Sequence, residues 1–105
     1  MEFYRRLFFG PQIKKRRKEI LWKLRPGKPL HNIFLITLPS NQQNLLDIVP
    51  ANLLLQPYYK RQKLFVLGVG KGRDEVLELL RAFVERIYAE TGDIKITDYI
   101  AGEKR

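Results

Sequence analysis

Apolar side chains recur at helical spacing over residues 73–91, the most regular pattern in the sequence, with charged side chains on the opposite face. Asp74 and Glu75 stand in the first turn, where the helix dipole favours negative charge. Gly92 follows the last turn, a common terminating position. The pattern therefore predicts one long amphipathic helix. Its apolar stripe consists of Val76, Leu79, Leu80, Phe83, Val84 and Ile87.

A second helical pattern covers residues 11–25 and ends at the Pro-Gly-Lys-Pro sequence that follows. Its apolar stripe consists of Ile13, Ile20, Leu21 and Leu24. Trp22 falls on the opposite side together with Lys15 and Lys18, although packing of Trp22 beneath Phe8 and Phe9 is an alternative. Arg17 falls inside the stripe, which requires either an aliphatic stem lying along apolar surface or a carboxylate partner.

Short apolar runs bounded by turn residues predict strands between these helices. Residues 32–38 are predicted to form the first strand, and residues 45–49 its return strand in a hairpin. Residues 63–69 are apolar almost throughout, which is typical of a strand covered on both faces. Residues 51–56 fit either a short helix or a further strand. Residues 93–100 fit either an edge strand or a last helical turn.

The predicted fold is a single α+β domain over residues 1–105, with the element order α-β-β-(α)-β-α. Residues 1–28 form the basic N-terminal segment and helix. Residues 29–105 form a small three- or four-stranded, largely antiparallel sheet with the long C-terminal helix packed on it. A length of 105 residues and a hydrophobic content of 45% fit one globular domain.

The positive charge is concentrated in the first quarter of the chain. Residues 1–28 carry ten lysines and arginines against two glutamates, which is +8 of the total net charge of +9. Such an asymmetry favours an anionic partner. The alternative is a solvated basic face that only keeps the protein in solution.

Side chains suited to catalysis are few, and no enzymatic activity, cofactor or metal site is expected. The chain has no cysteine, which excludes thiol chemistry and disulfides. His31 and Ser40, the only residues of their kinds, bracket the first predicted strand at about 30 Å if it is extended, too far for a nucleophile and its base. Charges interrupt the first ten residues, as they do not in a secretory signal, and no apolar run reaches the ~18 residues of a membrane span. These features favour a cytoplasmic protein.

The glycine-rich segment 68–72 stands between a predicted strand and a helix, where backbone N–H groups can bind phosphate. Its spacing matches neither a P-loop nor a dinucleotide fingerprint, and Asp74 and Glu75 would repel an anion there. We therefore expect a tight turn over 70–72 that needs glycine dihedral angles. Asp47 is the one carboxylate within an apolar strand, and it either points outward or pairs with Arg17 or Lys63.

The remaining candidate is a non-enzymatic interface for RNA or DNA, in which cations bind phosphates and exposed aromatic rings stack on bases. No known recognition motif is present. The predicted nucleic-acid-binding residues are Lys14, Lys15, Arg16, Lys18, Trp22, Lys23, Arg25, Lys28, Tyr58, Tyr59, Lys60 and Arg61. Two alternatives stay open: a basic amphipathic helix on a membrane surface, and a protein-interaction or homodimeric domain that uses the hairpin and the leucines at 53–55.

Three segments carry a family resemblance: residues 32–38, 44–48 and 66–75. There, and in the basic segment before Ile20, the chain resembles small proteins of Firmicutes, including gut clostridia, to which no activity is assigned. The resemblance implies a bacterial cytoplasmic protein and identifies no site residues.

Overall fold

The computed structural model describes residues 2–24, 28–39, 46–56, 64–93, 95–96 and 99–100. Its strands are β1 (Glu2–Phe9), β2 (Ile33–Thr37), β3 (Asp47–Pro50) and β4 (Phe65–Lys71). Its helices are the 3₁₀ helix η1 (Lys14–Arg16), α1 (Arg17–Leu24), the 3₁₀ helix η2 (Ala51–Leu55) and α3 (Arg73–Thr91). The α+β class and the long helix over 73–91 are confirmed, and the ambiguous segment 51–56 contains a short helix.

The strands form one four-stranded sheet in the order β1-β4-β2-β3. The hairpin of β2 and β3 is antiparallel, as predicted, and β2 also runs antiparallel to β4. β1 pairs with β4 in parallel, so the sheet is mixed. The predicted order was wrong at its start, because the chain opens with an edge strand and not with a helix.

The sequence pattern did not predict β1, because charged residues interrupt the alternation of apolar and polar side chains along the strand. Phe3, Leu7 and Phe9 pack with the core on one face of the sheet, whereas Tyr4 and Phe8 pack with the core on the other. Arginines occupy the middle of the strand, within the stretch between Phe3 and Phe8 where the register with β4 is irregular. Parallel pairing with a strand some sixty residues away leaves no local signal in the sequence.

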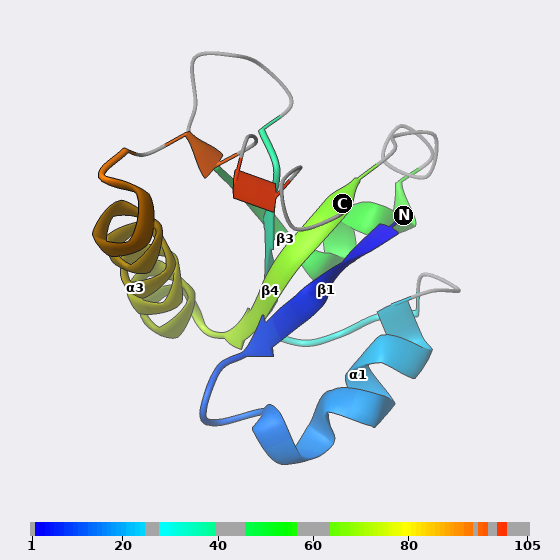
Figure 1. Cartoon of the computed structure of the whole chain (residues 1–105). Helices are drawn as coiled ribbons and strands as arrows, with labels where there is room; N and C mark the ends of the chain where they lie inside the picture. The colour runs from blue at the N-terminus through cyan, green and yellow to red at the C-terminus, as the bar shows by residue number, and fades with distance from the viewer. Residues whose placement is uncertain are drawn as a thin grey trace.

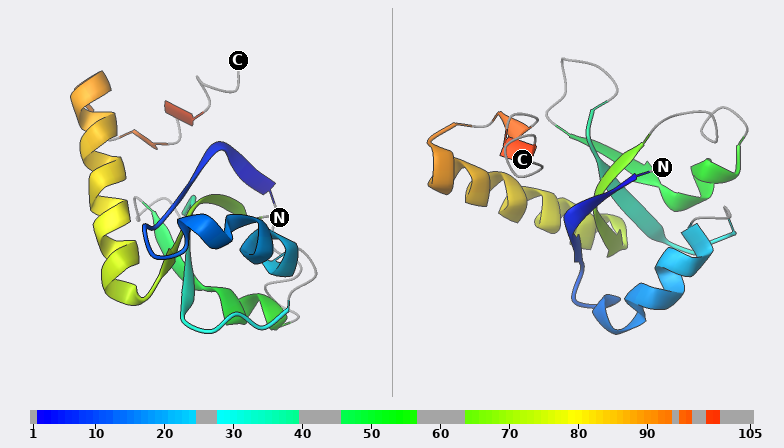
Figure 2. Two further views of the ribbon diagram at one scale, coloured as in Figure 1. Left: turned by 90° about the horizontal axis from the view of Figure 1, so that it is seen from below. Right: turned by 45° about the vertical axis from the view of Figure 1, so that its right-hand side comes forward.

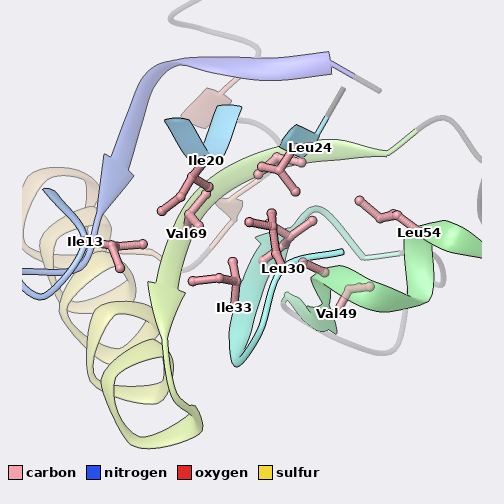
Figure 3. Close-up of a cluster of buried hydrophobic side chains, with 11 residues drawn as sticks. Ile13, Ile20, Leu24, Leu30, Ile33, Val49, Leu54 and Val69 are labelled. Atoms are coloured by element: carbon pink, nitrogen blue, oxygen red, sulfur yellow. The ribbon is translucent and has the colours of Figure 1, made fainter. Parts of the chain in front are cut away.

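The sheet separates two hydrophobic clusters, with α3 on one face and α1 together with η2 on the other (Figure 1; Figure 2, right). On the α1 face, Ile13, Ile20 and Leu24 are buried against strand residues such as Val69 (Figure 3). On the α3 face, Val76, Phe83 and Ile87 are buried. β4 is thus covered on both faces, as its apolar sequence predicted.

A bulge in β4 turns two successive residues toward α3. Ile36 pairs with Gly68 and Thr37 with Val66, which leaves Leu67 as the extra residue. Leu67 belongs to the core beneath α3, and Gly68 lies under the ring of Phe8, which packs on that same core. Gly68 therefore accommodates a close approach of side chain to backbone.

The junction of β4 and α3 differs from the expected turn over 70–72. β4 continues through Lys71, so only Gly72 lies between strand and helix, and its φ of 84° is the left-handed region that favours glycine. Gly70 lies within the strand against the backbone of Val76. At the other end of α3, Gly92 terminates the helix with a φ of 72°, as predicted.

The described part of the C-terminal tail is helical, which excludes the alternative of an edge strand there. The Tyr99 N–H donates to the Lys95 carbonyl at 3.1 Å, the spacing of an α-turn. Ile96 and Ile100 are buried in the cluster beneath α3. The Tyr99 hydroxyl also donates to Glu90 in α3 at 2.7 Å.

Candidate nucleic-acid interface

Four cationic side chains border one open depression of about 640 Å³, at the point where the chain enters α1. It is lined by Pro11, Lys14, Lys15, Arg17 and Lys18. All four cations are exposed. Within the described part of the chain, none of them forms an ion pair or a side-chain hydrogen bond. The depression therefore concentrates positive charge that no carboxylate of the described residues offsets.

The local conformation explains how consecutive cations reach one site. Residues three apart are neighbours on a helical surface, in a 3₁₀ turn as in an α-helix. That spacing brings Lys14 beside Arg17 and Lys15 beside Lys18 across the junction of η1 and α1. Two side-by-side cation pairs are unfavourable unless water, salt or an anion screens them.

Arg17 belongs to this site although the sequence analysis did not include it. Counting 100° per residue from Ile13 placed Arg17 within the apolar stripe, but the first turn is 3₁₀ and α1 begins only at Arg17. A 3₁₀ turn advances by about 120° per residue, which rotates every later position relative to an unbroken helix. Arg17 is exposed and has no carboxylate partner among the described residues. The sequence did contain one signal for the exposure of Arg17, since a cation does not fit an apolar stripe.

Two of the predicted cations share one carboxylate. Glu19 accepts hydrogen bonds from Arg16 Nε at 3.1 Å and from Lys23 Nζ at 3.3 Å. These bonds, the one from Arg16 first, lower the pKa of the Glu19 carboxyl below its ordinary value, so it is ionised at neutral pH. Arg16 and Lys23 are therefore partly neutralised, whereas the four cations of the depression have no carboxylate partner among the described residues.

Trp22 is exposed, which excludes its packing as ordinary core beneath Phe8 and Phe9. Its exposed fraction of 63% is large for a tryptophan. The Lys28 ammonium lies 4.0 Å from the centre of its ring, a cation–π contact. Lys28 is held there by its backbone N–H, which donates to the Lys23 carbonyl at 2.9 Å. Trp22 of α1 and Lys28, which follows the helix, thus form a second small unit.

The rest of the predicted interface lies outside the described residues. These residues are Arg25 and the second aromatic and basic patch, Tyr58 to Arg61. Their participation stays a prediction. The described part of the candidate interface consists of the depression, the Arg16–Glu19–Lys23 group and the Trp22–Lys28 unit.

Glu75 fixes the loop that leads into the depression, a role that the sequence did not reveal. Its carboxylate accepts hydrogen bonds from the backbone N–H groups of Gln12, at 3.0 Å, and of Lys71. A side chain at Gly10 would overlap this carboxylate. The sequence assigned Glu75 to the helix dipole alone, because its partners lie in two other segments of the chain.

We expect Glu75→Ala to lower the free energy of unfolding by about 1–2 kcal/mol more than Asp74→Ala, because it leaves the Gln12 and Lys71 N–H groups without their acceptor. Asp74 is the matched control, since it stands in the same helical turn and is exposed. Urea denaturation of the two variants measures the difference. Equal losses would show that Glu75 acts only through the helix dipole.

The β4–α3 junction is poorly suited to bind a phosphate. The Lys71 N–H donates to Glu75, and the Gly72 N–H donates to the Asn32 carbonyl at 2.8 Å. Both groups that a phosphate would need are therefore engaged within the chain, beside a carboxylate. The left-handed φ of Gly72 therefore explains this glycine better than a phosphate-binding turn does.

The described residues also lack two other kinds of feature. They contain no group of three or more side chains placed to hold a metal ion. They also contain no helix of the length and apolar character needed to cross a membrane.

Comparisons with protein-family models, with curated proteins and with solved structures give no match for this chain.

Proposed function

We propose that the protein is a non-enzymatic binding module that binds the phosphate backbone of nucleic acid. The observation that carries the proposal is the depression bordered by Lys14, Lys15, Arg17 and Lys18, whose charges are paired with no carboxylate among the described residues. An anion entering this depression relieves the repulsion between neighbouring cations. A polyanion does so at several positions at once.

Nucleic acid is a better match than a small anion for physical reasons. The cations are exposed and the depression is open, so a single small anion there would remain hydrated and gain little. A polynucleotide instead releases condensed counterions when its phosphates are neutralised, and this entropy drives binding even at an exposed surface. The net charge of +9 adds long-range attraction for a polyanion.

A salt series tests the proposal directly. Four phosphate contacts predict a slope of about −3 in a plot of log K against log salt concentration. We expect mixed-sequence RNA and DNA 20-mers, measured by fluorescence anisotropy from 50 to 400 mM NaCl, to give a slope of that size. Absence of binding at 50 mM NaCl, or an affinity that salt does not change, would overturn the proposal.

Self-association is the competing function, and the leucines expected to mediate it are largely engaged in the core. Of the leucines at 53–55, Leu54 is buried in the core beneath η2 and Leu53 packs on that core, so little of the expected apolar patch remains. Sedimentation velocity at micromolar concentration distinguishes the two functions. A dimer that dissociates when nucleic acid binds would mean that self-association and nucleic-acid binding use the same surface.

A further inference from the structure

Trp22 lies next to the cationic depression on α1. Lys18, which lines the depression, precedes Trp22 by four residues in the helix. Residues at this spacing are neighbours on one helical face, about 6 Å apart along the axis. A polynucleotide strand whose phosphates occupy the depression therefore carries its next bases toward the indole ring.

The Trp22 ring is held in place and still open to a ligand. One ammonium, that of Lys28 at 4.0 Å from the ring centre, covers at most one face of the indole. An exposed fraction of 63% means that most of the residue remains in contact with solvent. An exposed indole is unfavourable in water, and a stacked base would remove that apolar surface while Lys28 stays close to the nucleotide's phosphate.

We propose that the site selects single-stranded over double-stranded polynucleotides, with the backbone along the depression and one base stacked on Trp22. This inference rests on the proposed function and specifies its ligand. Bases in a duplex are stacked on one another, so their faces cannot reach a protein ring, whereas unpaired bases can. Stacking on one aromatic side chain changes affinity by roughly 5- to 100-fold.

Trp22 is the only tryptophan in the chain, so the intrinsic fluorescence reports on this one ring. The probes are a mixed-sequence single-stranded DNA 12-mer, the duplex of the same sequence, and a 12-mer of abasic sites with the same charge. We expect the first to quench the fluorescence saturably and to bind roughly 5- to 100-fold more tightly than the other two. Equal affinities for the three probes would overturn the inference.

Substitution separates stacking from charge. We expect Trp22→Leu to weaken single-strand binding by the same factor while leaving duplex binding and the salt slope unchanged, and Trp22→Tyr to retain most of the affinity. Tyr88→Leu is the matched control, because Tyr88 is exposed by 60% on α3, on the other face of the sheet. The change in single-strand affinity caused by Lys28→Gln measures how much the stacking on Trp22 depends on the cation–π contact.

The outcomes distinguish this inference from the proposed function. If no probe binds at 50 mM NaCl, the proposed function fails and the inference fails with it. If all probes bind with a steep salt dependence but Trp22→Leu changes nothing, or weakens duplex binding equally, only the stacking inference fails.

Discussion

Replacing Lys14, Lys15, Arg17 and Lys18 together by glutamine is expected to weaken binding of a single-stranded DNA 20-mer about 600-fold at 100 mM NaCl. Each phosphate contact on a single strand contributes about 0.7 to the slope of log K against log salt, so four contacts account for that factor between 1 M and 0.1 M salt. The salt slope itself should fall by about 3. Anisotropy titrations of the wild-type protein and the variant measure both quantities.

The control for this variant must lower the net charge equally at another place. Arg73→Glu combined with Arg86→Glu removes the same four charge units from α3, which lies across the sheet from α1 (Figure 1). Long-range attraction predicts a modest loss of affinity and a nearly unchanged slope for this control. Equal losses in the two variants would mean that binding follows net charge and that the depression is not a site.

The largest effect on stability is expected for Gly68→Ala. A Cβ at this position would overlap the ring of Phe8. The ring cannot turn away easily, because it packs on Phe83 with 5.0 Å between ring centres and belongs to the core beneath α3. Separation of β1 from β4, or repacking of this core, should cost about 3 kcal/mol of the free energy of unfolding.

Gly92→Ala is the control that separates the steric cost of an added Cβ from the cost of a left-handed backbone conformation. Gly92 has a φ of 72° and nothing within 4 Å of an added Cβ, so its substitution carries only the penalty of the left-handed conformation, about 1 kcal/mol. Urea denaturation compares the two variants. Adding Phe8→Leu to Gly68→Ala should recover part of the loss, and strict additivity in that double-mutant cycle would contradict the overlap.

The charge pattern on the surface of η1 and α1 shows how local geometry decides which cations of a basic run remain unpaired. Five consecutive basic residues look equivalent in the sequence, yet Glu19 engages Arg16 while the other four border the depression. The pairing follows from the three-residue spacing between Arg16 and Glu19. The composition predicted a cationic surface, but the junction of η1 and α1 decided which charges remain available.

Elements whose stabilising contacts are local or periodic could be predicted from the amino-acid sequence. The limits of α3, its Gly92 terminus, the β2–β3 hairpin and the doubly covered β4 follow from hydrophobic spacing and turn residues. The buried stripe of Ile13, Ile20 and Leu24 and the basic character of the first 28 residues were also readable.

The folded structure was needed to establish the position of β1, the hydrogen bonds of Glu75, the need for glycine at 68 and the exposure of Trp22. Each depends on a partner distant in sequence, or on which side of an element meets the sheet. Such contacts form only when the chain closes long loops, and their stabilisation comes from packing and not from local preference. A single sequence does not encode them in any short window.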